Sequence, residues 1–541
     1  MKTRRHAALF LNPLLPILGL LAIFCTSAIS AQEKGTAQEK GREMLDQVML
    51  DKLSARSLAQ LSPIVRDTQA AIDVGLSGDD LKFANFLLAA TLTERTTLVS
   101  RLVFDRPQPH PKWPDMRRLA IVDLSRAIKA DASIAQTHFL LGRYLALPGG
   151  DRKRAAEAFD VAIRLDADNK SVRAKALIYR ANLQPDPKKR LAGYNESLKL
   201  APRDAEALRA RGLFFFSAQK IKEAQADFAA GIKLNASDAT LHQAYGLTLM
   251  HQQKIAEAKK SFDRVIELAP ETAMAYVHRA QCHAFLKNSD AALADIEKSL
   301  KLSSRNSAAI LLRARVHASI GDAQGARTDV EQVLKLAPNN VEALLLRANL
   351  KAGKKDYEGA IADVETAHKL RPKSSDILLQ EALLFSFAKR PKQAIETFGR
   401  VLEIAPDRWT AYRGRGDVFL NMGQQAKAIS DYAAALKIEP KQTGVLNNLA
   451  WVLSTSPDAK LRDGRRAIGL AKQACELTEY KQAHIISTLA AGYAETGDFD
   501  NAVKWSKKAI EVGDESLQEP LRKELASYLE KKPWRELKQQ P

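Results

Sequence analysis

Cysteine is scarce in this sequence, and that scarcity limits what can stabilise the protein. The 541 residues contain three cysteines. Cys25 lies in the apolar start of the chain, and nothing in the sequence pairs Cys282 with Cys475. A chain without a disulfide framework must be held together by side-chain packing.

Motifs for catalysis or for binding a cofactor are also missing. The chain has no Gly-rich phosphate loop ending in Lys-Ser or Lys-Thr, no His-Glu-x-x-His and no Cys-x-x-Cys. The stretch "HRAQCH" places His278 and Cys282 one helical turn apart, with His283 adjacent, and such spacing can bind a metal. Cys282 and His283, however, take positions that other repeat copies give to apolar residues, so we favour a core role. We expect no enzyme activity, no catalytic residue, no metal and no cofactor.

Glycine and proline are few, at 26 and 21 residues, so the composition implies no large disordered region. Ala, Leu and Lys are abundant, which favours an all-α chain. The length exceeds what one compact core supports, so we expect several domains or an array.

Long apolar runs are absent except at the N-terminus. Lys2, Arg4 and Arg5 precede an apolar run over 9–29, and small residues at 28 and 30 suit a signal peptidase. We interpret residues 1–30 as a cleaved export signal, which predicts a periplasmic or secreted protein. The alternative is an uncleaved segment anchored in the inner membrane, because the run is about as long as a membrane span needs.

The net charge is +19, and cleavage would leave +16 (19 − 3). No single stretch concentrates this charge, so we favour a solvated basic surface. The alternative is a surface that attracts a polyanion or the cell envelope.

Self-similarity at a period of 34 residues organises most of the chain. Seven blocks start at residues 205, 239, 273, 307, 341, 375 and 409. Position eight is always Gly or Ala, position twenty is always Ala, and position twenty-four is always Phe, Tyr, Ile or Val. Pro stands at position thirty-two in five blocks. Two short helices that cross at small residues, with Pro ending the second, explain these choices.

This pattern resembles the tetratricopeptide repeat (TPR) family. The resemblance implies an all-α, right-handed superhelical solenoid of about 11–12 helix hairpins with an N-terminal helical cap and a C-terminal capping helix. We expect a signal peptide at 1–30, a mobile segment at 31–53, a helical region with a degenerate split repeat at 54–134 and divergent repeats at 135–204. Seven in-register repeats at 205–442, two further repeats at 443–516, and a capping helix and tail at 517–541 should follow. The first of the two further repeats has about five extra residues in its turn.

Two charges recur inside the apolar rows of the repeat. Arg occupies position seven and Asp occupies position twenty-three in the same five blocks, and the remaining two blocks lack both. We therefore predict an ion pair between the two helices of each hairpin, because the guanidinium fork can meet a carboxylate with two hydrogen bonds. The predicted pairs are Arg211 with Asp227, Arg279 with Asp295, Arg313 with Asp329, Arg347 with Asp363 and Arg415 with Asp431, and Arg95 with Asp123 is a degenerate sixth.

The TPR resemblance also implies where a partner would bind. In that family, positions two, five, nine, twelve and thirteen of the first helices face a concave groove and contact partner peptides. The candidate partner-binding residues at positions five and nine are Arg209, Gln243, Gln281, Arg315, Asn349, Arg413 and Asp417. The wall lacks the Lys and Asn pattern of the family's clamp for terminal carboxylates, and it lacks the Asn ladder of TPR glycosyltransferases.

We therefore expect a non-enzymatic scaffold of the cell envelope that binds a protein or peptide in the concave groove. We expect no nucleic-acid partner and no stable membrane insertion after signal cleavage. The alternative function is binding of a polyanion or the envelope surface through the basic surface. A polyanion would be bound less tightly as ionic strength rises, which separates the two hypotheses.

Overall fold

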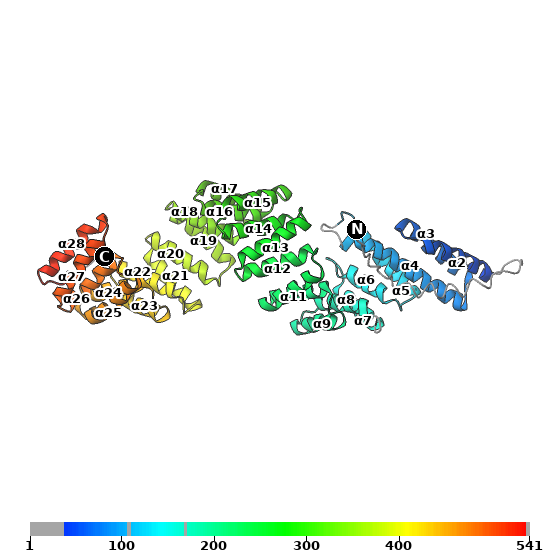
Figure 1. Cartoon of the computed structure of the whole chain (residues 1–541), viewed down its shortest axis with the longest axis horizontal. Helices are drawn as coiled ribbons and strands as arrows, with labels where there is room; N and C mark the ends of the chain where they lie inside the picture. Colours follow the sequence, from blue (N-terminus) through cyan, green and yellow to red (C-terminus); the bar gives the residue numbers. More distant parts are fainter. Residues whose placement is uncertain (1–36, 105–109, 167–169, 537–541) are drawn as a thin grey trace, which may run out of the picture. The chain divides into compact units, whose positions relative to one another are not determined.

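The computed structural model describes residues 37–104, 110–166 and 170–536. Over these ranges the chain forms helices and no strand. The chain divides into two compact units, with the boundary between Gln252 and Gln253 (Figure 1). Within each unit, every helix packs against its neighbours in sequence, so the predicted all-α architecture of successive helix hairpins is confirmed.

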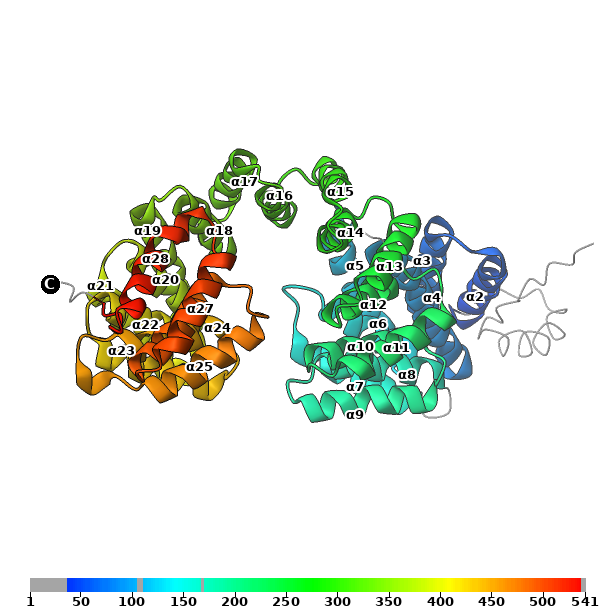
Figure 2. The ribbon, with the colours of Figure 1, turned by 60° about the vertical axis from the view of Figure 1, so that its left-hand side comes forward.

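The first unit contains the helices up to Gln252, which pack against their neighbours in sequence and are drawn in blue to green in Figure 2. Its helices are α2 (Ala37–Ser54), α3 (Leu58–Gly75), α4 (Gly78–Phe104), α5 (Trp113–Ala130), α6 (Ala135–Leu145), α7 (Arg152–Leu165), α8 (Lys170–Asn182), α9 (Pro187–Leu200), α10 (Ala205–Ser217), α11 (Ile221–Leu234) and α12 (Ala239–His251).

The second unit continues the same alternation of a 13-residue and a 14-residue helix. Its helices are α13 (Ile255–Leu268), α14 (Ala273–Phe285), α15 (Ser289–Leu302), α16 (Ser307–Ser319), α17 (Ala323–Leu336), α18 (Val341–Gly353), α19 (Tyr357–Leu370), α20 (Ser375–Phe387), α21 (Pro391–Ile404), α22 (Trp409–Asn421), α23 (Gln425–Ile438), α24 (Thr443–Thr455), the 3-10 helix η1 (Ala459–Leu461), α25 (Gly464–Leu477), α26 (Ala483–Glu495), α27 (Phe499–Val512) and α28 (Glu515–Leu529).

The helix starts follow the 34-residue spacing of the sequence. In all seven blocks the first helix begins at the first residue of the block and the second begins sixteen residues later, as in α16 and α17. The block at 443 has its second helix, α25, twenty-one residues after the first, because five extra residues that include η1 lengthen the turn. The sequence therefore places these helices residue by residue.

The tight turn between the two helices needs one left-handed residue. Position fifteen of the blocks has a positive φ, and it is glycine in two of them, with φ of 84° at Gly321 and 71° at Gly423. Lys and Gln take the same conformation elsewhere, for example Gln219 at φ 59°. An Asp, Asn or Ser before many first helices then caps them, as Asp204 does by accepting hydrogen bonds from the backbone of Glu206 and Ala207.

Close packing inside each hairpin explains the small residue at position eight. A Cβ added to Gly212 would lie 2.6 Å from the ring of Phe228, and one added to Gly416 would lie 2.8 Å from the ring of Tyr432. Blocks with Ile or Val at position twenty-four tolerate Ala at position eight, as Ala314 does opposite Val330. In these blocks, positions eight and twenty-four therefore share one volume. The block at 375 combines Ala382 with Phe398, and the Phe398 ring packs closely against Gly414 of the next block.

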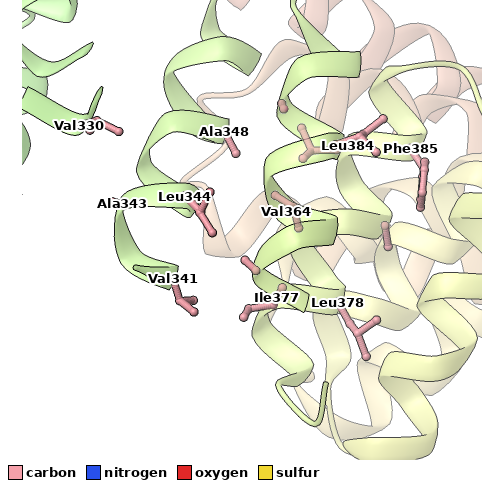
Figure 3. Close-up of a cluster of buried hydrophobic side chains, with 14 of the residues drawn as sticks. Val330, Val341, Ala343, Leu344, Ala348, Val364, Ile377, Leu378, Leu384 and Phe385 are labelled. Carbon is pink, nitrogen blue, oxygen red and sulfur yellow. The ribbon is translucent and has the colours of Figure 1, made fainter. Parts of the chain in front are cut away.

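Apolar side chains of successive hairpins join into continuous cores. The largest cluster extends from α16 to α22, and Figure 3 shows its part around α18 to α20, where Leu344, Val364, Ile377 and Leu378 are buried. Each hairpin therefore completes the core of the next, as expected for repeats that cannot bury their faces alone.

The N-terminal part of the described chain corrects one prediction. We expected residues 31–53 to be mobile, but residues 37–53 lie in α2, which packs against α3. Leu45 and Val48 are 3% exposed and belong to a core with Leu61 and Ile64 of α3. One turn of apolar spacing within a polar sequence is enough to hold this helix on its neighbour. The predicted export signal, residues 1–30, lies outside the described residues, as do residues 31–36 of the predicted mobile segment and residues 105–109 of the predicted split repeat.

The C-terminal helix α28 covers the last hairpin. Leu521 packs in the core formed by α22 to α27, and Tyr528 packs in a cluster with residues of α26 and α27. None of the helices in the described residues combines the length and apolar character that a membrane span requires.

Candidate functional site

The structure brings all five predicted Arg–Asp pairs together. In each hairpin, Nε and Nη2 of the Arg donate to the two carboxylate oxygens of the Asp at 2.6–2.9 Å. The Asp side chains are 3–9% exposed and the Arg side chains are 22–27% exposed. These hydrogen bonds raise the pKa of all five Arg side chains above its usual value. The five Arg are therefore committed to carboxylates inside the fold.

Each Arg also reaches beyond its own hairpin where a partner is available. Nη1 of Arg279 donates to Asp263 at 3.0 Å, and Nη1 of Arg347 donates to Glu331 at 3.1 Å. Both partners belong to the preceding repeat, so these Arg side chains join neighbouring hairpins.

The residue at position eleven of the block also lies beside the buried Arg–Asp pair. Nδ1 of His317 lies 3.3 Å from Asp329, and Nζ of Lys351 lies 2.8 Å from Asp363. In three other blocks this position is Phe, and the guanidinium of Arg211 lies 5.8 Å from the ring centre of Phe215. The degenerate pair has the same geometry, since Arg95 donates two hydrogen bonds to Asp123 at 2.6 and 2.9 Å.

The block with Glu at position seven uses a different contact. Glu381 is 7% exposed and lies 3.6 Å from Nδ1 of His368 in the preceding repeat. Burial raises the pKa of Glu381 and lowers the pKa of His368. This carboxyl group therefore has a charge partner in the neighbouring hairpin.

A groove on the first helices of the first unit is the best-formed candidate binding site. It is a cavity of about 720 Å³ lined by α8, α10 and α12, with contributions from α9 and α11. Arg209 and Gln243, two of the predicted partner-binding residues, both line it. Leu213 between them is 50% exposed, so the groove offers apolar surface to solvent.

Polar side chains fix the walls of this groove. Arg209 extends from α10 to the start of α12, where Nη1 donates to Thr240 Oγ1 at 2.5 Å. Tyr179 donates its hydroxyl to Glu206 at 2.8 Å, and burial raises the pKa of Tyr179 to about 12. The groove thus combines an aromatic and aliphatic floor with two cationic groups, Arg190 and Arg209, and one anionic group, Glu206.

The sequence did not reveal the aromatic side of this groove. Tyr179, Tyr194, Phe214 and Phe216 all line it, and the rings of Tyr194 and Phe214 are 6.1 Å apart. The three consecutive Phe residues at 214–216 were the available signal. They were missed because the preceding repeat, residues 171–204, departs most from the pattern, so its inward-facing residues were not assigned.

The remaining candidate residues belong to the second unit and do not form one site. Arg315 pairs with Glu342 at 2.6 Å, and Asn349 accepts a hydrogen bond from Gln380 at 2.7 Å. Gln281 is half-buried on α14. These contacts link the first helices of neighbouring repeats.

Arg413 and Asp417 lie together on α22. Their side chains are 3.7 Å apart, and Asp417 also accepts hydrogen bonds from Tyr432 at 2.7 Å and Asn448 at 3.2 Å. Asp417 is thus already held by three neighbours, whereas Arg413 remains half-exposed.

The "HRAQCH" stretch is part of the packing. Cys282 is fully buried, and the ring of His278 stacks on Phe262 with 5.3 Å between centres. Burial raises the pKa of the Cys282 thiol to about 11 and that of the Cys475 thiol to about 12, so both stay protonated. Within the described ranges, no three His, Cys, Asp or Glu side chains are grouped so as to hold a metal ion.

Comparison with known proteins agrees with the repeat architecture. A model of the tetratricopeptide repeat matches residues 244–307, 311–375 and 379–443. These residues are therefore tetratricopeptide repeats. No match was found among curated proteins.

Three solved structures are similar to parts of this chain. A tetratricopeptide repeat protein from Parabacteroides merdae ATCC 43184 is 17% identical, covering 45% of this chain and 97% of its own, with a TM-score of 0.37. YrrB, described as a TPR protein with an unusual peptide-binding site, is 19% identical over 35% of this chain and 98% of its own, with a TM-score of 0.31. MamA is 20% identical over 30% of this chain and 96% of its own, with a TM-score of 0.29.

Proposed function

We propose that this protein is a non-enzymatic scaffold that binds a partner protein or peptide on its first helices, with the groove on α8, α10 and α12 as the principal site. The observation that carries the proposal is the cavity of about 720 Å³ at positions two, five and nine of these helices. Tetratricopeptide repeats generally act in protein interaction, and the groove adds a concave, partly apolar surface with a few fixed polar groups.

The chemistry of the groove indicates the kind of ligand. Leu213, Leu247 and Phe216 provide apolar contacts, while Arg209 and Glu206 provide one charge of each sign. An extended segment that places an apolar side chain on Leu213 and an acidic group near Arg209 fits this surface.

We also propose that the protein is exported through residues 1–30 and acts in the cell envelope, with an inner-membrane anchor as the alternative.

A photo-crosslinking residue introduced at Leu213 tests the site. The matched control is the same residue at Lys222, which is exposed on α11 and outside the groove. We expect a partner to crosslink at 213 and not at 222, and we expect Arg209→Glu to reduce the yield. Because Leu213 is half-exposed, its replacement should leave the melting temperature unchanged. Equal recovery of the same proteins from both positions would overturn the groove as the binding site.

A second candidate function, binding of a polyanion or of the envelope surface, has one local feature in its favour. Trp505 of α27 stacks on Tyr480, 5.4 Å between ring centres, beside Lys504, Lys507 and Lys508 and a cavity of about 390 Å³. Retention on a heparin column should then fall when the three Lys are replaced by Glu. Retention that is equal for the wild type and this variant would exclude this patch.

A further inference from the structure

The chain after α28 returns to the second unit's first helices. Residues 532–536 are irregular, and their direction is set where α28 ends, because the backbone of Lys532 donates to the Ser527 carbonyl at 2.9 Å and the Ser527 hydroxyl donates to the Lys532 carbonyl at 2.9 Å. The following segment, Trp534-Arg535-Glu536, is here called the C-terminal segment. It packs against α24 and α26.

Each residue of the C-terminal segment has a specific partner. The Trp451 indole donates to Glu536 Oε1 at 2.6 Å, and the Glu536 backbone donates to the Thr455 carbonyl at 3.0 Å. Nη1 of Arg535 donates to the Ser454 carbonyl at 3.1 Å. The ring of Trp534 packs on the cluster formed by α26, α27 and α28, which contains Ala490 and Tyr528.

Glu495 is the electrostatic centre of this contact. Its side chain is 14% exposed and lies between two guanidinium groups, with Arg462 Nε donating to Oε1 at 2.9 Å and Arg535 Nη2 at 2.5 Å from Oε2. Arg462 belongs to the turn of its hairpin, whereas Arg535 comes from the C-terminal segment. One oxygen of a largely buried carboxylate thus has its charge partner in a removable segment of chain.

The partners occupy the inward-facing positions of the repeat. Trp451 and Thr455 are positions nine and thirteen of the block at 443, and Glu495 is position thirteen of the block at 483. On α10 the same positions are Leu213 and Ser217, which line the open groove of the first unit. The C-terminal segment therefore covers, on α24 and α26, a face that is open on α10.

We propose that the inward face of α24 and α26 is a second peptide-binding site, and that the chain's own C-terminal segment occupies it until a partner displaces it. The partner is a short extended peptide with an aromatic residue, an Arg and an acidic residue in succession. Trp534, Arg535 and Glu536 define this chemistry through the contacts that they make. The site is separate from the groove on α8, α10 and α12, so the failure of one proposal leaves the other standing.

Tethering makes the occupied state the default. A segment joined to its site by a few residues has an effective concentration in the millimolar range, so a free peptide competes poorly against it. Weakening the C-terminal segment should therefore expose the site to a peptide added in solution.

The test uses a fluorescent, C-terminally amidated peptide of residues 530–536 and measures fluorescence anisotropy with full-length protein. The variant Trp534→Ala with Arg535→Ala releases the segment, and we expect it to bind the peptide at least about tenfold more tightly than the wild type. Lys532→Ala is the matched control, because its side chain pairs only with the exposed Glu530 and should leave binding at the wild-type level.

A second substitution shows whether the peptide uses the proposed site. Trp451→Phe in the released variant keeps the ring and removes the indole N–H, so affinity should fall by about tenfold. A peptide with Glu in place of Arg535 should not bind. If the double variant is unfolded by circular dichroism, Arg535→Ala alone gives the decisive measurement. A folded released variant that binds no better than the wild type, or binding that Trp451→Phe leaves unchanged, would overturn the proposal.

Discussion

A buried carboxylate that accepts two hydrogen bonds from an Arg recurs in five hairpins. This pair specifies how the two helices of the hairpin pack against each other. Asp329 is 3% exposed in its side chain, and Arg313 and His317 lie beside its carboxyl group. The Arg of the first helix donates hydrogen bonds to the Asp of the second helix. These directional bonds fix the register of the two helices, whereas an apolar contact through Leu would not. The same residue-scale logic applies to position eight in the blocks at 205 and 409, where the ring of Phe228 or Tyr432 leaves no room for a methyl group on Gly212 or Gly416.

Arg313→Ala should destabilise the protein by about 3 kcal/mol, because it leaves Asp329 buried with only His317 nearby. Arg315→Ala is the matched control two residues away, since its pair with Glu342 is about half-exposed and should contribute less than about 1 kcal/mol. Urea unfolding of both variants measures the difference. Replacing Arg313 by Met together with Asp329 by Leu should cost less than Arg313→Ala alone. Equal effects of Arg313→Ala and Arg315→Ala would contradict a structural role for the buried pair.

Gly212→Ala should destabilise the first unit by about 1–3 kcal/mol, because the new methyl group meets the ring of Phe228 at 2.6 Å. The same change at Gly399 in α21 has open space and should stabilise by roughly 0.5–1 kcal/mol through helix propensity. Thermal unfolding followed by circular dichroism should therefore show opposite shifts. A stabilising Gly212→Ala would mean that the hairpin adjusts more easily than its packing indicates.

At the scale of elements, α28 buries a carboxyl group beside a hydroxyl group, whereas the buried Asp side chains of the five hairpins are paired with Arg. Glu524 is 7% exposed, and the Ser487 hydroxyl of α26 donates a hydrogen bond to it. Burial raises the pKa of Glu524 to about 7 from an ordinary 4.5. At pH values between 4.5 and about 7, Glu524 therefore keeps its proton in the folded state and has lost it in the unfolded chain.

Stability should fall as pH rises from about 4.5 to about 7, because the unfolded state binds fewer protons than the folded state in this window. The full effect of Glu524 is on the order of 3 kcal/mol. Urea unfolding of the wild type and Glu524→Gln at pH 5 and pH 8 measures it. The variant should lose less stability than the wild type between these pH values, and an identical loss would show that Glu524 is ionised in the folded protein.

At the scale of the whole chain, each helix packs mainly on its sequence neighbours, so disturbances should remain local. The largest core, from α16 to α22, is built from contributions of consecutive hairpins and has no residue from α26 to α28. A repeat array of this kind opens in parts and not as one cooperative body.

Hydrogen exchange measured by mass spectrometry should detect this locality. In Arg313→Ala, exchange should increase in α16 and α17 and in the hairpins beside them, while α26 to α28 keep the wild-type protection. An equal increase over all of 253–536 would instead show that the second unit unfolds as a single cooperative body.

The amino-acid sequence by itself determined the repeat. Residues at positions eight, twenty, twenty-four and thirty-two act within one hairpin or its immediate neighbour, so a fixed spacing of 34 residues predicts the helix starts from 205 to 425 and the five extra residues before α25. The Arg–Asp pairs were predictable for the same reason, because their two members appear and disappear together at a fixed separation.

Only the tertiary structure showed the contacts that do not follow the 34-residue spacing. The helix α2 forms because Leu45 and Val48 find an apolar partner in α3. The aromatic groove on α8, α10 and α12 needs side chains from three hairpins, one of them divergent. The contact of Arg535 with Glu495 joins residues forty apart with no repeated pattern. Periodic local contacts can be recognised in a single sequence because they recur, whereas a contact made once leaves no second copy to reveal it.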